Sequence, residues 1–244
     1  KYKMSKLMYE TKITPLLRFF HVQNIKPVGW IEIDKKKYRN NPAKLSRCNI
    51  EINTTYEDVM PLNINKIGRL LVASFDIECT SEDGSFPQAD RPGDEVIQIG
   101  TSIYEYGNNE CLYKHMITLK DCDEIDDVDL ECYATEKDVI LAWANFIHRL
   151  DPDIITGYNI WGFDEKYLYD RAKTGCGGKF PSFIDRFMKK LSRNITLTPK
   201  YNEEGHKLSS SALGDNVLYY YEIEGLVQID LSVSYTHLTL PTTD

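Results

Sequence analysis

The chain has 244 residues, of which 42% are hydrophobic and 11% aromatic, and it carries a formal net charge of -8. That length allows one large domain or two small ones, and the apolar content is enough for a packed core. No apolar run approaches the roughly 18 residues of a membrane span and no signal peptide opens the sequence, so we expect an intracellular protein without a membrane partner. The cysteines are scattered without a Cys-x-x-Cys pair, which favours reduced thiols over a zinc site or disulfide framework.

The charge is unevenly distributed, which bears on the class of partner. Residues 121–136 are strongly acidic, whereas Lys179–Lys207 is net basic and Asp34–Arg39 forms a second basic run. Each basic run is also typical of a solvated face. A negative net charge argues against a nucleic-acid partner, but a protein that binds divalent cations gains positive charge that offsets its own carboxylates. The composition therefore leaves a nucleic-acid partner open.

Residues 1–67 alternate polar and apolar side chains without a strong helical period. Two short runs, Ile31–Ile33 and Cys48–Ile52, have the period of two that is typical of strands. We therefore predict a partial, β-rich N-terminal domain over residues 1–67. Because the sequence opens with Lys1 and Tyr2, we expect it to continue a longer protein.

From residue 68 onward the pattern predicts an α/β domain that begins with an apolar strand over Leu70–Glu78. Helices are indicated by apolar side chains at helical spacing, and strands by shorter apolar runs between turn-forming residues. The elements predicted in chain order are a loop over Thr80–Gly93, strands over Val96–Tyr106 and Cys111–Leu119, a helix over Glu136–Leu150, a strand over Ile154–Gly157, and helices over Glu165–Lys173 and Ser182–Arg193. The sequence also predicts a final hairpin around Gly225, with strands over Leu218–Glu222 and Leu226–Leu231.

Two carboxylates end the first strand of this domain. Asp76 and Glu78 are two residues apart, so their side chains project to one face of the strand. Their mutual repulsion is unfavourable unless a cation compensates for it. The alternative is a solvated strand end, which is a common setting for an isolated Asp-x-Glu.

A second polar signature follows the predicted strand Ile154–Gly157. Tyr158 and Asn159 come directly after this strand, and Phe163 and Asp164 precede a helix. If the two strands are neighbours, Asp164 completes a cluster of three carboxylates, whose hard oxygen atoms suit Mg²⁺ or Mn²⁺. Two such ions can clamp the attacking and leaving oxygens of a phosphodiester. Taken singly, Asn159 could be a turn residue, Asp164 a helix N-cap and Phe163 part of the core.

Together the two signatures resemble the exonuclease motifs of family B DNA polymerases. Phe75–Glu78 is similar to the first motif of that family, and Gly157–Asp164 is similar to the second. Further segments resemble DNA polymerase delta and related enzymes of large DNA viruses, and they keep the family's order. These segments are Val28–Ile33, Glu95–Gly100, Asp151–Gly157, Ser209–Asn216 and Leu218–Tyr221.

The resemblance implies that residues 68–232 adopt the ribonuclease H-like α/β fold of a 3′–5′ exonuclease, incomplete at its C-terminus. Residues 1–67 would be part of the N-terminal domain of the same polymerase. The parent protein would be a replicative DNA-directed DNA polymerase, located in the nucleus or in a viral replication compartment. Its partners would be the single-stranded 3′ end of a primer and the primer–template duplex, with a sliding clamp bound through regions outside this sequence.

The resemblance also implies a proofreading reaction. Two-metal hydrolysis of the 3′-terminal phosphodiester of DNA would release a deoxynucleoside monophosphate. Asp76, Glu78 and Asp164 would be the catalytic carboxylates that hold two divalent cations, Mg²⁺ or Mn²⁺. The side chains expected to bind the terminal nucleotide are those of Tyr158, Asn159 and Phe163.

The last residues, 233–244, depart from the family. The resemblance implies an amphipathic helix after Leu231, whereas Val233–Thr242 is rich in threonine and has no helical period. Back-translated, this run resembles a sequencing-library adapter read in frame, and the alternative is an ordinary irregular terminus. We interpret residues 233–244 as a non-native tail. We therefore expect the chain to lack the third exonuclease motif, to expose an apolar patch where the missing helix would lie, and to be inactive or impaired as a nuclease.

Two other functions fit part of the sequence. A non-catalytic single-stranded DNA-binding or scaffold module could keep the fold without the acids, but all three carboxylates are intact here. A stand-alone nuclease of the same superfamily would keep the acids, but it would not carry the segment around Trp30. Both alternatives stay open at this point.

Overall fold

The computed structural model describes residues 13–175, 182–210 and 214–233. The chain divides into two compact units, Lys1–Gly68 and Arg69–Asp244. Within the described residues no helix is both long enough and apolar enough to cross a lipid bilayer. The predictions made for residues 234–244 lie outside the described part of the chain.

The first unit is built from short elements. Its described elements are helix α1 (Pro15–Gln23), strands β1 (Trp30–Glu32), β2 (Tyr38–Asn40) and β3 (Ile52–Thr54), the 3-10 turn η1 (Tyr56–Asp58) and strand β4 (Met60–Leu62). Strand β1 pairs antiparallel with β4, and β2 pairs antiparallel with β3. From residue 13 to residue 68 the unit thus contains two separate strand pairs rather than one sheet.

The strand predicted over Cys48–Ile52 is wrong in its position. Instead, the residues before Glu51 fold over its side chain. The Glu51 carboxylate accepts hydrogen bonds from the backbone amides of Leu45 at 3.0 Å and Ser46 at 2.9 Å. These bonds fold the preceding residues into a compact turn, so that extended pairing begins only at Ile52.

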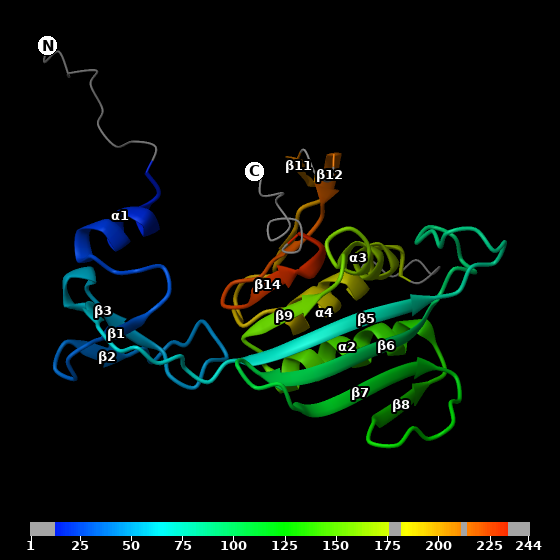
Figure 1. The fold of residues 1–244 in the computed structure, drawn as a ribbon, viewed down its shortest axis with the longest axis horizontal. Helices are drawn as coiled ribbons and strands as arrows, with labels where there is room; N and C mark the ends of the chain where they lie inside the picture. Colours follow the sequence, from blue (N-terminus) through cyan, green and yellow to red (C-terminus); the bar gives the residue numbers. More distant parts are fainter. Residues whose placement is uncertain (1–12, 176–181, 211–213, 234–244) are drawn as a thin grey trace, which may run out of the picture. The chain divides into compact units, whose positions relative to one another are not determined.

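The second unit is organised around one six-stranded sheet. Its strands are β5 (Leu71–Cys79), β6 (Val96–Glu105), β7 (Cys111–Leu119), β8 (Asp129–Tyr133), β9 (Ile154–Gly157) and β14 (Val227–Asp230). They lie side by side in the order β14, β9, β5, β6, β7, β8 (Figure 1). Because β5 is antiparallel to β6 but parallel to β9, the sheet is mixed and the unit is an α/β domain.

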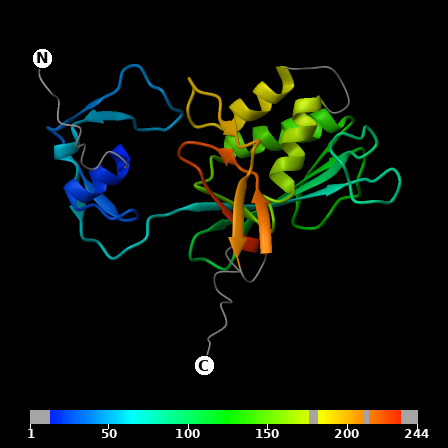
Figure 2. The same cartoon turned by 90° about the horizontal axis from the view of Figure 1, so that it is seen from above.

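Helices cover one face of this sheet. They are α2 (Glu136–Leu150), α3 (Asp164–Thr174) and α4 (Ser182–Leu191), and Figure 2 shows them together on one side of the strands. The core lies between this layer and the sheet, where Phe75 and Trp143 have ring centroids 4.8 Å apart and Phe187 packs behind Trp143. The predicted helix over Glu136–Leu150 is confirmed with its bounds, and its N-terminus is capped by Thr135.

The predicted hairpin around Gly225 is wrong. Gly225 does turn the chain, with a positive φ of 80°, but the strands on its two sides belong to different sheets. Strand β13 (Tyr221–Glu222) pairs with β10 (Lys200–Tyr201), whereas β14 adds to the main sheet parallel to β9.

A different hairpin is present. It consists of β11 (His206–Ser210) and β12 (Gly214–Leu218), which pair antiparallel and stand clear of the six-stranded sheet (Figure 1). Strand β8 was not predicted from the sequence either. It lies inside the acidic run of residues 121–136 and has no continuous run of apolar residues.

Candidate active site

Strand β5 sorts its side chains between two environments. Phe75 and Ile77 are buried against the helical layer, while Asp76 and Glu78 point to the opposite face and are exposed. This alternation follows from the period of two of a strand. The two carboxylates therefore share one face of the sheet, as the sequence predicts.

The neighbouring strand of the second signature is β9. It pairs in parallel with β5, with Val72 opposite Ile154 and Ser74 opposite Thr156, so the predicted neighbourhood of the two strands is confirmed. Gly157 ends β9 in close contact with β5, since a Cβ atom at this position would lie 2.5 Å from the backbone oxygen of Phe75.

Asp164 begins helix α3 and is buried beside the first signature. Its Oδ1 accepts a hydrogen bond of 3.1 Å from the backbone amide of Ile77, the residue between Asp76 and Glu78. Burial, and secondly the negative charge of Asp76, raise the pKa of Asp164 to about 7. The carboxylates of the two signatures therefore influence one another through space.

These carboxylates have the donor chemistry for a divalent cation. No lysine or arginine is among the groups that shift the pKa of Asp164, and the described ion pairs include none to Asp76, Glu78 or Asp164. Hard carboxylate oxygens are the ligands that Mg²⁺ and Mn²⁺ prefer. In the described side chains, however, no three acidic, histidine or cysteine residues are gathered closely enough to hold an ion. The three-carboxylate cluster therefore stays a prediction.

The predicted nucleotide-binding residues lie on the loop between β9 and α3. Tyr158 is 69% exposed and, with Asp76 and Glu78, lines a hollow of about 740 Å³ on the open face of the sheet. Asn159 adopts the left-handed conformation with a φ of 60° and is exposed. Phe163 lines a second hollow of about 470 Å³ on the other side of the loop. The structure thus separates Tyr158 and Phe163 between two hollows.

An exposed aromatic residue that sequence analysis missed stands beside Phe163. Phe86 comes from the loop after β5, is 67% exposed and meets Phe163 edge to face at 5.2 Å between ring centroids. The only signal for it was an aromatic residue in a segment rich in turn formers.

Hydrogen bonds attach the loop that carries Phe86 to helix α3. The guanidinium of Arg171 in α3 pairs with Glu136 of α2 and donates hydrogen bonds to the backbone oxygens of Ala89 and Arg91, at 3.1 Å and 2.8 Å. Tyr167 of α3 donates a further hydrogen bond of 2.8 Å to the backbone oxygen of Asp94. The loop carrying Phe86 is therefore held against the same helix that begins with Asp164.

A buried carboxylate that sequence analysis also missed lies behind the second signature. Asp230 ends β14, is 2% exposed and accepts the backbone amides of Asn159 and Trp161, both at 2.9 Å. Its sequence signal resembles that of Asp76, because it too is an acidic residue near the end of a predicted strand.

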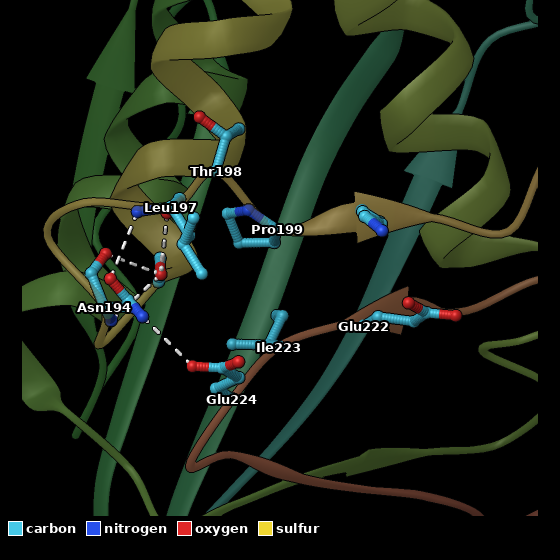
Figure 3. Close-up of a pocket in the computed structure, with 9 residues that line it drawn as sticks. Asn194, Leu197, Thr198, Pro199, Glu222, Ile223 and Glu224 are labelled. Atoms are coloured by element: carbon cyan, nitrogen blue, oxygen red, sulfur yellow. Dashed lines mark hydrogen bonds between the residues drawn. The ribbon is translucent and has the colours of Figure 1, made fainter.

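A third hollow, of about 380 Å³, lies elsewhere in the unit (Figure 3). Two of its lining residues are joined by a hydrogen bond of 3.0 Å that Asn194 donates to Glu224. None of the predicted site residues lines it. It therefore adds nothing to the carboxylate site.

Comparison with known proteins decides the family. The family described as DNA polymerase family B, exonuclease domain, matches residues 6–241. The chain belongs to this family. Nucleases of this domain family depend on metal ions, which agrees with the carboxylate chemistry of the two signatures.

Individual relatives are consistent with the family. The chain is 43% identical over 164 residues to a DNA polymerase of Acanthamoeba polyphaga mimivirus, covering 67% of the chain and 9% of that relative. It is 39% identical over 227 residues to the DNA polymerase delta catalytic subunit of Arabidopsis thaliana, covering 91% of the chain and 20% of that relative. A DNA polymerase of Paramecium bursaria Chlorella virus NY2A is 30% identical over 92% of the chain and 24% of its own length. The chain thus spans less than a quarter of the length of each of these three relatives.

Proposed function

We propose that residues 68–232 form a 3′–5′ proofreading exonuclease with a ribonuclease H-like fold, and that residues 1–67 belong to the N-terminal domain of the same replicative DNA-directed DNA polymerase. The observation that supports this most directly is the hydrogen bond from the Ile77 amide to Asp164. It connects the carboxylate of the second motif to the strand segment that carries Asp76 and Glu78. The family match over residues 6–241 supports the same conclusion.

In this proposal Asp76, Glu78 and Asp164 hold two divalent cations, Mg²⁺ or Mn²⁺. Bound there, the cations supply the Lewis acidity for attack of water on the 3′-terminal phosphodiester of DNA, with release of a deoxynucleoside monophosphate. A cation also favours the ionised form of Asp164, whose pKa is raised to about 7 by burial and by the charge of Asp76. Protein oxygens and cation thus compensate each other's charge.

The loop residues would handle the substrate. Tyr158 is exposed in the same hollow as Asp76 and Glu78, so it can contact a nucleotide held near the carboxylates. Asn159 offers an exposed amide at the same end of β9, and Phe163 offers a ring next to Phe86. Bases stack on aromatic rings without sequence preference, which suits a nuclease that removes any mismatched nucleotide.

The wider setting of the protein follows from the same proposal. Its partners are the single-stranded 3′ end of a primer and the primer–template duplex, and a sliding clamp would bind regions outside this sequence. The location is intracellular, in the nucleus or in a viral replication compartment. Residues 233–244 are interpreted as a non-native tail.

The test uses the paired variant Asp76→Ala with Glu78→Ala, made in the full polymerase that carries this chain. Degradation of a 5′-labelled primer in Mg²⁺ should be lost, while nucleotide incorporation on a primed template should persist. Glu105→Ala, which changes a half-buried acid at the far end of β6, is the matched control and should leave both activities intact. Retained Mg²⁺-dependent degradation in the paired variant would show that the chemistry lies elsewhere.

A further inference from the structure

Asp230 is a buried carboxylate that the proposed chemistry does not use. It is the last residue of β14, lies in register with Gly157 of β9 and is 2% exposed. Each of its oxygens accepts hydrogen bonds from backbone amides, Oδ1 from Asn159 at 2.9 Å and Oδ2 from Trp161 at 2.9 Å. Ser232 adds its amide at 2.8 Å and its hydroxyl at 2.6 Å, both to Oδ1. Four donors therefore converge on one carboxylate.

The two loop amides form a small anion-binding concavity. Asn159 has a φ of 60°, and its left-handed conformation turns the following amides inward. Backbone N–H groups that converge in this way bind an anion, and Asp230 supplies it from within the fold. On the other side of the turn, the backbone oxygen of Asn159 accepts the amides of Gly162 at 3.0 Å and Phe163 at 2.9 Å. The loop is thus closed from both sides just before Asp164 begins α3.

The hydrogen bonds to Asp230 also leave it unsuited to binding a cation. Both of its oxygens are already occupied by protein donors, and the side chain is sealed from solvent, so it is poorly placed to coordinate a cation. Burying a carboxylate without a cationic partner is costly. Charge-assisted hydrogen bonds to four donors offset that cost only while the loop keeps this conformation. The burial of Asp230 and the conformation of the loop therefore stabilise each other.

We infer that Asp230 is a positioning residue of the nuclease site, which fixes Asn159 directly and, through the turn that it closes, fixes Asp164 against the first-motif strand. The inference rests on the proposed function, because it assumes that Asp164 takes part in cation binding. It assigns to β14 a role beyond extending the sheet. The strand carries the anchor for the loop of the second motif.

The test compares Asp230→Asn with Asp153→Asn in the full 244-residue chain. Asp153 precedes β9 at its opposite end and also accepts a backbone amide, that of Leu71 at 2.9 Å, so its variant is the matched control. Asp230→Asn presents an amide group to donors that need an acceptor. Hydrogen exchange at Asn159 and Trp161 should accelerate at least about tenfold, while the amides of β6 keep their protection. Affinity for Mn²⁺, followed by electron paramagnetic resonance, should fall about tenfold, the effect usual when a group that orients a ligand is lost.

Asp153→Asn should leave both measurements at their original values. Asp76→Asn and Asp164→Asn serve as references for the site itself. If both references weaken Mn²⁺ binding but Asp230→Asn does not, the inference is overturned and the proposed function stands. If neither reference weakens it, the proposed function fails and takes the inference with it, whereas a chain that binds no Mn²⁺ leaves the decision on the inference to hydrogen exchange.

Unchanged exchange at Asn159 and Trp161 in Asp230→Asn would overturn the inference whatever the metal affinity. If the variant does not fold in plain buffer, both measurements are made in trimethylamine N-oxide, which favours the folded state without filling the anion-binding concavity. Faster exchange across the whole sheet would assign Asp230 a general structural role and would also overturn the inference.

Discussion

The two units of the chain are stabilised by different means. In the second unit a contiguous set of apolar side chains is buried between the sheet and its helices. In the described part of the first unit Val59 is the one hydrophobic side chain that is buried, and Trp30 remains 41% exposed. Burial of apolar area is the main favourable term in folding, so most of the stability of the described chain must reside in the second unit.

Polar contacts replace the missing core in the first unit. The carboxylate of Glu51 gathers donors from Leu45, Ser46 and Asn41, and the indole of Trp30 donates to the backbone oxygen of Lys66. Hydrogen bonds of this kind exchange for bonds to water on unfolding, so each contributes modestly. The effect of a substitution on stability should therefore depend on the unit in which it lies. Four predictions test this difference, in order of decreasing effect.

The largest effect is expected in the core of the second unit. Trp143 is 1% exposed and packs on Phe75, directly beneath the carboxylates of β5. Trp143→Ala should lower the free energy of unfolding by about 4 kcal/mol, since it leaves a large cavity. Trp30→Ala in the first unit should cost about 1 kcal/mol. Denaturant unfolding measures both, and similar costs at the two positions would break the comparison.

The buried ion pair of the second unit should come next. Glu136 and Arg171 are 2% and 1% exposed, so Glu136→Ala removes a carboxylate that pairs with a buried guanidinium. We expect a loss of about 3 kcal/mol. The exposed pair Arg69 and Glu105, 2.8 Å apart, provides the control, because Glu105→Ala should cost about 0.5 kcal/mol or less. Equal losses in the two variants would mean that burial of the pair has no energetic consequence.

The same contrast explains what the sequence could predict. Strands β5 and β9 were predicted from their apolar runs, and helix α2 from apolar residues at helical spacing, because burial imposes these patterns on the sequence. Helix α1 was not predicted, although its apolar residues include Leu16, Phe19 and Phe20 at helical spacing, and none of its residues is buried. Its start is set by Thr14, whose side chain accepts the Leu17 amide, and by Pro15 in the first turn. Capping residues of this kind are present in the sequence, but they predict a helix less strongly than a periodic apolar pattern does.

The candidate site divides in the same way. Asp76 and Glu78 could be placed on one face from spacing alone, and the parallel pairing of β5 with β9 agrees with that prediction. The partner of β14 could not be predicted, because the turn at Gly225 suits a hairpin equally well. The role of Asp230 was hidden for the same reason, since its donors on Asn159 and Trp161 are about 70 residues away in the sequence.

A third prediction concerns the pH dependence of the second unit without metal. The pKa of Asp164 is raised to about 7 by burial and by Asp76, so the folded chain holds a proton that the unfolded chain loses near pH 4. The stability from this group is fully present below about pH 4 and is lost as the pH rises through 7. Asp164→Asn cannot ionise, so at pH 8 it should be more stable than the unmodified chain by about 2–3 kcal/mol.

This gain should shrink toward zero at pH 4, and denaturant unfolding in a chelator at both pH values measures it. Asp76→Asn should lower the pKa of Asp164, as followed by carboxyl NMR, because it removes one of the two main causes of the shift. An equal gain at pH 4 and pH 8 would mean that the charge of Asp164 is not what destabilises the unit.

The smallest effect, and the opposite sign, is expected in the first unit. The hydroxyl of Ser46 and nearby amides lower the pKa of Glu51 to about 2, so the stability from this group is present above its ordinary value of 4.5 and is lost as the pH falls through 2. Glu51→Gln should therefore lower the exchange protection of the Leu45 and Ser46 amides at pH 6, and the unmodified chain should approach the same protection near pH 2. Glu32→Gln, an exposed change on β1, is the control. Because the carboxylate is solvated, the loss of exchange protection should stay near Glu51 and leave the amides of the second unit unchanged. If the amides of β5 also lost protection, the two units would not be stabilised by different means.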